Sequence, residues 1–138
     1  MRVIADTSIW SLALRRHSPV QNPESETLRK IIQGGEDIYL IGIILQEILQ
    51  GIKKPEDFTS LKKYLDAFPL LEIKRGDYIK AAELKNHLSR KGVQVSAIDV
   101  LIAVAAIVND CCLYTNDRDF DQIAKHSQLK LLRPEGKR

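Results

Sequence analysis

The stretch Arg2-Val3-Ile4-Ala5-Asp6-Thr7-Ser8 has the pattern of a short buried strand that ends at a carboxylate. Its apolar run predicts a strand over Arg2–Ala5 that enters the core. Thr7 or Ser8 can then serve as the N-cap of a helix that runs through Trp10, because a hydroxyl there accepts a hydrogen bond from an amide of the first turn. A strand followed directly by a helix is the unit from which α/β folds are built.

Strands and helices alternate along the rest of the chain, which predicts a parallel sheet covered by helices on both faces. His17–Glu24, which contains two prolines, is expected to be a loop. We find no internal repeat and no long linker, so we expect one domain that spans residues 1–138. The strands predicted after the first are Asp37–Ile41, Leu70–Ile73, Cys111–Tyr114 and Leu129–Leu132. The helices predicted after the first are a segment that carries Leu28, Ile31 and Ile32 on one face, then Ile43–Ile52, Glu56–Phe68, Tyr78–Lys91, Ala97–Val108 and Asp119–His126.

The composition is that of a globular protein with a basic surface. Of the 138 residues, 44% are hydrophobic and 28% are charged, and the net charge is +3. If four acids were set apart in one pocket, the remainder would carry +7, which favours a nucleic-acid partner. Basic residues recur in pairs, which would equally suit solvated helix ends and loops. These pairs are Arg15-Arg16, Lys53-Lys54, Lys62-Lys63, Lys74-Arg75, Arg90-Lys91 and Lys137-Arg138.

The sequence gives no sign of a membrane partner or of export. The most apolar stretches are interrupted by carboxylates and fall short of a bilayer span, and no signal peptide is recognisable. Cys111 and Cys112 are adjacent, which fits two reduced thiols better than a disulfide. We therefore expect a cytoplasmic protein.

Four carboxylates lie at or near the ends of the predicted strands. Asp6 ends the first strand, and Asp117 follows Cys111–Tyr114. Glu47 lies on the helix after the second strand, and Asp99 lies in the first turn of the helix before the fourth. Functional sites of open α/β sheets lie at the carboxyl ends of the strands, so we expect all four acids to converge on one edge.

Each acid also has a purely structural explanation. Asp6 and Asp117 would suit a cap or a turn, Asp99 has capping-box spacing from Ser96, and Glu47 would simply face water. The set is harder to explain in this way. Glu47 and Asp99 interrupt apolar helices, where a charge is costly unless it is paired or bound to a metal.

Carboxylates gathered in one pocket repel each other, and a hard divalent cation removes that conflict. Mg²⁺ and Mn²⁺ prefer such oxygen ligands, and this kind of site is typical of phosphodiester hydrolysis by metal-activated water. Thr7, Ser8 and Thr115 would orient a water or a ligand. The chain lacks G-x-x-x-x-G-K-[ST], G-x-G-x-x-G and G-x-S-x-G, so those nucleotide-binding and serine-hydrolase motifs are excluded.

Four short motifs together resemble a PIN domain, and more narrowly the VapC toxins of prokaryotic toxin–antitoxin pairs. The resemblance covers nearly the whole chain. The motifs, in order, are Val3-Ile4-Ala5-Asp6-Thr7-Ser8, Glu47 in the helix after the second strand, Ala97-Ile98-Asp99 at the start of an apolar helix, and Tyr114-Thr115-Asn116-Asp117-Arg118-Asp119-Phe120.

The resemblance implies an α/β/α sandwich with a central parallel sheet of four to five strands. It also implies an endoribonuclease that depends on Mg²⁺ or Mn²⁺, with transfer RNA or ribosomal RNA as the usual target of VapC relatives. A homodimer is implied, held inactive by a VapB-like antitoxin that pushes a basic side chain toward the acidic pocket. The Glu56–Phe68 and Ile43–Ile52 helices would contact either the antitoxin or a second copy.

The resemblance also assigns roles by position. Asp119 would assist or replace Asp117, and Asp121 belongs to the first turn of the next helix. Glu47 would position a metal or a water. The acids that match the metal-binding positions of the family are Asp6, Glu47, Asp99 and Asp117.

Two functions of other classes stay open. A receiver-like regulatory domain also has acids at strand ends, but it would need paired acids after the first strand and a lysine after the last, which this chain lacks. An RNA-binding module that does not cut would bind through the basic pairs. Its binding would be sensitive to salt and independent of the four acids.

Overall fold

The structure is a computed structural model that describes residues 1–14 and 22–133. In these residues, five strands form a sheet in which every pair is parallel, in the order β3-β2-β1-β4-β5. The predicted parallel sheet is therefore confirmed. The strands are β1 (Arg2–Ala5), β2 (Asp37–Ile41), β3 (Leu70–Leu71), β4 (Cys112–Tyr114) and β5 (Lys130–Leu132).

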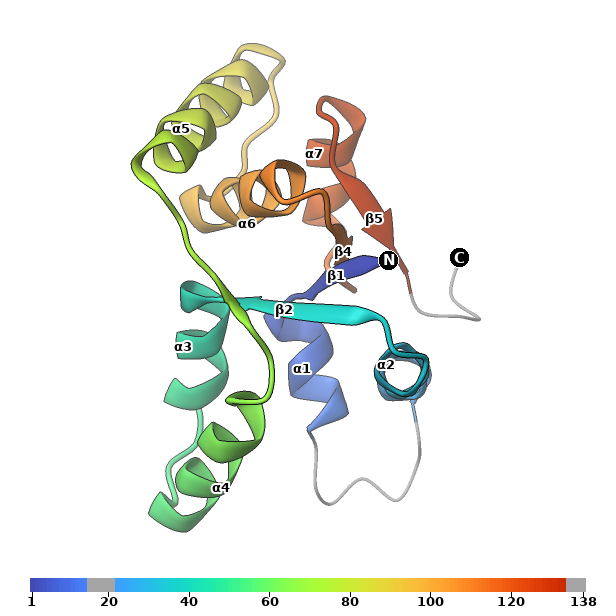
Figure 1. The fold of residues 1–138 in the computed structure, drawn as a ribbon. Coiled ribbons are helices and arrows are strands. Elements are labelled where there is room, and N and C mark those ends of the chain that lie inside the picture. Colours follow the sequence, from blue (N-terminus) through green and yellow to red (C-terminus); the bar gives the residue numbers. More distant parts are fainter. Residues whose placement is uncertain (15–21, 134–138) are drawn as a thin grey trace.

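Helices cover both faces of the sheet, so the predicted α/β/α sandwich is confirmed as well (Figure 1). The helices from the first half of the chain lie on one side, and those from the second half lie on the other. The first group is α1 (Thr7–Ala13), α2 (Pro23–Gln33), α3 (Gly42–Gln50) and α4 (Pro55–Leu65). The second group is α5 (Arg75–Arg90), α6 (Ala97–Val108) and α7 (Asp119–Lys125).

The two central strands, β1 and β4, form the middle of the core. Ile4 and Ala5 pair with Leu113 and Tyr114, and all four side chains are fully buried. The chain leaves β1 toward β2 and β3 on one side and returns to β4 and β5 on the other. The strand order therefore reverses at β1 and β4, and α/β proteins place their sites at the carboxyl ends of strands at such a point.

The start of α1 differs from the prediction. Its N-cap is Asp6, whose side chain accepts a hydrogen bond from the Ile9 amide, rather than Thr7 or Ser8. The extended backbone of Asp6, with φ −83° and ψ 177°, ends the strand and starts the helix at a single residue. The hydroxyls of Thr7 and Ser8 are therefore available to other acceptors.

Two helices begin earlier than predicted because their first turns are capped by polar residues. Pro23 is the first residue of α2, after an Asn22 cap, so only the part of the predicted loop up to that point remains outside the helix. Residues 15–21 of that loop lie outside the described residues. Helix α5 begins at Arg75, where the Lys74 amide donates to the Asp77 carboxylate at 2.9 Å.

The buried face of α5 differs in part from its apolar pattern. That pattern predicts Ile79, Ala82 and Leu88 on the inner face. In the structure Leu88 is buried together with Ala81, whereas Ile79 is 55% exposed. The other predicted elements are confirmed in kind, with ends that differ by a few residues. Strand β3 is the shortest and forms one edge of the sheet.

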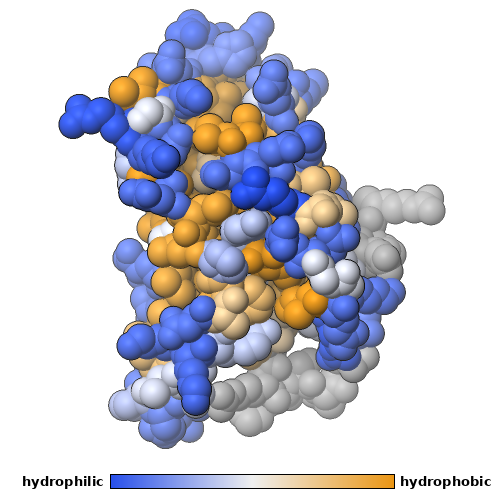
Figure 2. Space-filling view, in the orientation of Figure 1, coloured by the Kyte–Doolittle hydropathy of each residue, from blue (hydrophilic) through white to orange (hydrophobic). Residues whose placement is uncertain are grey.

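Hydrophobic side chains gather across the middle of one face, where the chain between α4 and α5 crosses β2 (Figure 2). Leu70 of the edge strand β3 is 56% exposed. Within the described part of the chain, no helix has the length and apolar character needed to cross a membrane.

Truncating Leu113 to Ala is expected to lower the free energy of unfolding by about 2–5 kcal/mol, because this fully buried side chain would leave a cavity beside β1. The matched change Leu70→Ala, at an exposed edge position, is expected to cost no more than about 0.5 kcal/mol. Denaturant unfolding of both variants measures the difference. Equal losses would contradict the placement of β4 at the centre of the core.

Candidate active site

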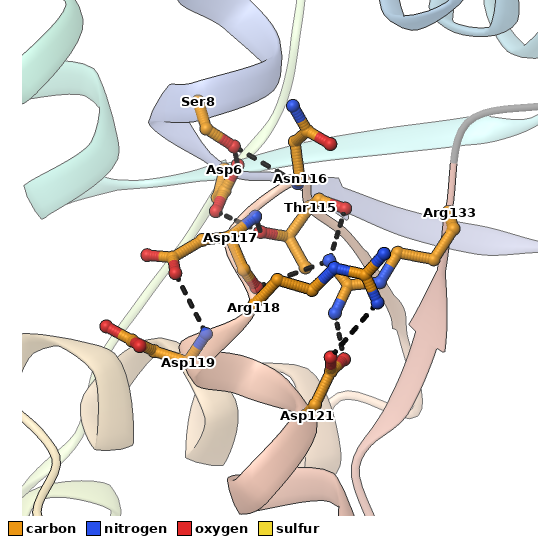
Figure 3. Close-up of polar contacts among 9 residues, drawn as sticks. All are labelled: Asp6, Ser8, Thr115, Asn116, Asp117, Arg118, Asp119, Asp121 and Arg133. Atoms are coloured by element: carbon orange, nitrogen blue, oxygen red, sulfur yellow. Dashed lines mark hydrogen bonds and ion pairs between the residues drawn. The ribbon is translucent and has the colours of Figure 1, made fainter. Parts of the chain in front are cut away.

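Asp6 lies at the junction of β1 and α1 and is held by hydrogen bonds on both carboxylate oxygens (Figure 3). Its Oδ1 accepts from Ser8 Oγ at 2.6 Å and from the Ile9 amide at 3.3 Å. Its Oδ2 accepts from Thr115 Oγ1 at 2.5 Å. The residue is only 4% exposed. The side chain therefore has one orientation, fixed by groups from α1 and from the segment that follows β4.

Burial raises the pKa of the Asp6 carboxyl above its ordinary value, and the nearby charge of Asp117 raises it further. The hydrogen bonds from Ser8, Thr115 and the Ile9 amide lower this pKa and offset part of the rise. Asp6 is thus a buried acid whose ionised form is solvated by protein hydroxyls in place of water.

The segment after β4 is tied to the segment after β1. Thr115 is fully buried, and its Oγ1 both donates to Asp6 and accepts from the Asp117 amide at 3.0 Å. The Asn116 amide donates to Ser8 Oγ at 3.2 Å. One hydroxyl from each segment therefore joins the two strand ends.

Asp117 and Asp119 follow on the same segment, at the start of α7. The Asp119 amide donates to Asp117 Oδ1 at 2.9 Å. Both carboxylates are set by this turn rather than by the sheet itself (Figure 3). Asp121 lies in the first turn of α7, as predicted, and pairs with Arg118.

Asp99 approaches from helix α6. Ser96 caps this helix by accepting from the Asp99 amide at 3.0 Å, so Asp99 lies in the first turn. Burial raises the pKa of the Asp99 carboxyl, and the charges of Asp117, Asp119 and Asp6 raise it further. These charges come from two segments, one after β1 and one after β4, so Asp99 lies near both of them.

Among the described residues, the carboxylates of Asp99, Asp117 and Asp119 each offer an oxygen that lies within 4.8 Å of the other two. Such a set of hard oxygen donors suits Mg²⁺ or Mn²⁺. The choice between Asp117 and Asp119 is not forced by this geometry, because both belong to the group. Their function as metal ligands stays a prediction.

Glu47 lies beside this group rather than in it. From helix α3 its Oε1 accepts a hydrogen bond from Thr7 Oγ1 at 2.8 Å, and Thr7 directly follows Asp6. Glu47 also lines a pocket of about 780 Å³ between α1, α3 and α4. Besides Glu47, the pocket is lined by Ser11, Ala13, Leu14, Ile48, Gly51, Ile52, Asp57, Ser60, Leu61 and Tyr64.

The sequence analysis missed Arg133, which directly follows β5. Its guanidinium donates to the carbonyl oxygens of Thr115 and Asp117 and pairs with Asp121. A single arginine before a basic tail carries no signal that distinguishes it from other surface cations. Residues 134–138 lie outside the described residues.

The family model of the PIN domain matches residues 3–126, a range that contains all four predicted acids. The chain belongs to the PIN-domain family. The resemblance found in the motifs is thereby confirmed. The acidic group of this PIN domain, Asp99, Asp117 and Asp119, comes from two of the segments that carried the motifs, α6 and the segment after β4.

Relatives of this PIN domain extend over almost its full length. VapC ribonuclease Mb1587 of Mycobacterium bovis is 28% identical over 130 residues, which are 93% of this chain and 96% of the relative. Ribonuclease VapC2 of Rickettsia felis is 27% identical over 128 residues, which are 89% of this chain and 92% of the relative.

Solved structures share the fold. A chain of VapBC2 from Rickettsia felis, bound to a DNA fragment from its promoter, has a TM-score of 0.78 and 25% identity, and the match covers 96% of this chain and 98% of that one. VapBC-1 from nontypeable Haemophilus influenzae has a TM-score of 0.77 at 15% identity, with 96% and 98% covered.

Replacing Asp99 with Asn is expected to stabilise the metal-free protein at neutral pH. The fold raises the pKa of Asp99, so the ionised side chain costs folding free energy that the neutral amide avoids. The gain is largest above the raised pKa and disappears as the pH falls below 3.8, where Asp99 is protonated in both states. Thermal unfolding with a chelator, at a series of pH values, measures this difference.

The matched control is Glu56→Gln, which removes an exposed carboxylate from the first turn of α4. We expect no gain in its Tm, because a carboxylate there favours the helix dipole and lies outside the acidic group. An Asp99→Asn protein that is no more stable than the wild type at pH 7 would contradict the predicted cost of burying the ionised Asp99 carboxylate beside the other acids.

Proposed function

We propose that this PIN domain is an endoribonuclease that depends on Mg²⁺ or Mn²⁺ and acts as the VapC-type toxin of a toxin–antitoxin pair. The observation that carries the proposal is the convergence of Asp99, Asp117 and Asp119, with Asp6 beside them, at the ends of β1 and β4. The names of the relatives as VapC ribonucleases support RNA as the substrate.

A divalent cation fits the donor set, because its ligands here are carboxylate oxygens that otherwise repel each other. Asp99 and Asp117 would hold it, with Asp119 as a further ligand, and Asp6 would complete the site from β1. When bound, such an ion lowers the pKa of a bound water and stabilises charge on the leaving oxygen of a phosphodiester.

The side chains of the site divide the remaining work. Asp6 is fixed between Ser8 and Thr115, so it keeps its orientation as substrate enters. Glu47, held by Thr7, would orient the attacking water and take up its proton. No side chain needs to form a covalent bond to the RNA.

The basic pairs would contact the RNA backbone. Four of them are exposed at helix ends: Lys53-Lys54 and Lys62-Lys63 at the two ends of α4, and Lys74-Arg75 and Arg90-Lys91 at the two ends of α5. Exposed basic pairs are also common at solvated helix ends that bind nothing. Their role in binding is therefore inferred from the proposed RNA substrate and not from their position. The pairs Arg15-Arg16 and Lys137-Arg138 lie outside the described residues.

Transfer RNA or ribosomal RNA is the proposed target, and the cytoplasm the proposed place of action. The alternative of an RNA-binding module without cleavage is an outcome of the test below. The receiver-like alternative is not proposed, since the chain belongs to the PIN-domain family.

The pocket between α1, α3 and α4 is the proposed binding site of a VapB-like antitoxin. Ile48, Ile52 and Leu61 give it apolar surface, and Glu47 and Asp57 line it as well, so it suits an amphipathic segment with basic side chains. Structural neighbours such as VapBC2 are toxin–antitoxin complexes, which supports this kind of partner. A homodimer is also proposed, with a second copy as the competing occupant of the pocket.

Changing Asp6 or Asp117 to Asn is expected to abolish cleavage of total RNA while the fold survives, because each change removes a charged oxygen from the metal site. Wild-type protein, free of antitoxin, is expected to cleave only when Mg²⁺ or Mn²⁺ is present. Gel analysis of the RNA with and without chelator measures both effects, and the fragments identify the target.

The matched control is Asp66→Asn, at an exposed position after α4, which is expected to cleave like the wild type. RNA that is bound but never cut, under either metal, would support the binding module instead. Cleavage that persists in chelator would reject the proposed metal.

Truncating Tyr64 to Ala is expected to weaken antitoxin binding at least about tenfold, because tyrosines in the centre of an interface often contribute 2 kcal/mol or more. RNA cleavage by the free toxin is expected to be unchanged. Calorimetry with the co-expressed antitoxin, separated and recombined, measures the affinity.

The matched control is Tyr78→Ala on α5, where the tyrosine is 56% exposed and lies outside the pocket. If Tyr64→Ala instead changed the mass of the free protein in light scattering, a second copy would be the occupant of the pocket. Equal antitoxin affinity in both variants would place the antitoxin elsewhere.

A further inference from the structure

Arg133 lies beside the start of the segment that carries Asp117 and Asp119. Strand β5 pairs with β4 so that Leu132 lies opposite Tyr114, and the Thr115 amide donates to the Leu132 carbonyl at 3.3 Å. The next residue on each strand is therefore Arg133 on β5 and Thr115 on β4. This alignment brings the arginine to the same sheet edge as the acids.

The guanidinium of Arg133 makes contacts with three residues of this segment and of α7 (Figure 3). Its Nη1 donates to the Thr115 carbonyl at 2.9 Å and to the Asp117 carbonyl at 3.2 Å, and its Nη2 pairs with Asp121 Oδ1. The side chain is only 23% exposed. Its donors are thus directed into the protein rather than toward a ligand in solution.

These contacts restrain the backbone on both sides of Asn116. The Thr115 carbonyl and the Asp117 carbonyl are drawn to one nitrogen, which fixes the turn between them. That turn sets two things: the Thr115 hydroxyl that donates to Asp6, and the direction of the Asp117 carboxylate. A planar fork with several fixed donors can do this, whereas a lysine ammonium cannot reach the same acceptors in the same geometry.

We propose that Arg133 is a positioning residue for the metal site, which holds the Thr115–Asp119 segment in the conformation that aims its carboxylates at Asp99. This inference rests on the proposed function. Arg133 acts through Asp117 and Asp119 and does not touch the substrate. It also lies beyond residue 126, where the match to the family model ends, so this part of the site comes from outside the matched range.

A direct contact between Arg133 and an RNA phosphate is the competing explanation for any loss of activity. The two explanations differ in which quantity changes. Loss of a positioning residue lowers the affinity for the metal ion measured without RNA, and it lowers the rate at which bound RNA is cleaved. Loss of a phosphate contact lowers the affinity for RNA and changes the salt dependence of that affinity.

The test compares Arg133→Gln and Arg133→Lys with the wild type. The matched control is Lys130→Gln, which removes a cation of the same strand whose partner, Asp110, lies at the opposite end of β4. Three readouts are used: amide hydrogen exchange of Thr115, Asp117 and Asp119 by NMR, Mn²⁺ affinity by calorimetry without RNA, and the kcat and KM for RNA cleavage.

In Arg133→Gln, we expect faster exchange at the Thr115 and Asp117 amides while core amides keep their protection. We expect Mn²⁺ affinity to fall roughly 10–100-fold, which is typical when a residue that supports metal ligands is lost. The kcat should fall with little change in KM. Arg133→Lys should show the same changes to a smaller degree, and Lys130→Gln should show none.

The proposal is overturned if Arg133→Gln matches Lys130→Gln in exchange and in Mn²⁺ affinity. It is equally overturned if only KM rises, because Arg133 would then contact RNA. If Arg133→Gln does not fold, Arg133→Lys decides by the same readouts. If the wild type neither binds Mn²⁺ nor cleaves RNA, the proposed function fails. Unchanged amide hydrogen exchange in the Arg133 variants would separately reject the positioning role of Arg133.

Discussion

The buried hydrogen bond between Thr115 Oγ1 and Asp6 Oδ2 joins the ends of the two central strands, and the site depends on it. Asp6 caps α1, while Thr115 Oγ1 accepts a hydrogen bond from the Asp117 amide. One contact thus sets the start of a helix, the orientation of a buried carboxylate and the course of the segment with the other acids. A polar link of this kind is stable in the core only because each of its atoms has a partner.

The carboxylates of the site repel each other. Burial and neighbouring charges raise the pKa of both Asp6 and Asp99, so the protein without a cation pays folding free energy to keep them together. Sites that bind substrates or metals commonly carry such a cost. The restraint from Arg133 fits this balance, since carboxylates that repel each other turn apart unless the backbone is held.

Glu47 connects the site to a second region of the surface. On one side it accepts a hydrogen bond from Thr7, next to Asp6, and on the other it lines the pocket between α1, α3 and α4. A partner segment in that pocket would therefore lie beside a member of the predicted catalytic set. Inhibition by such a partner requires no change of fold, because a basic side chain that pairs with Glu47 would already alter the charge next to Asp6.

The α/β architecture and the four candidate acids could be predicted from the sequence, because strand-then-helix alternation and charges in apolar segments are local patterns that need no knowledge of contacts. The sequence pattern misjudged the cap of α1 and the buried face of α5, since capping and burial depend on which side chains a turn brings together. Three relations came from the three-dimensional contacts: Asp119 lies with Asp99 and Asp117, Glu47 lies beside this group, and Arg133 donates hydrogen bonds to the segment that follows β4. Those relations join residues far apart in the chain, and the register of β4 against β1 and β5, which brings them together, is fixed by packing rather than by any local pattern.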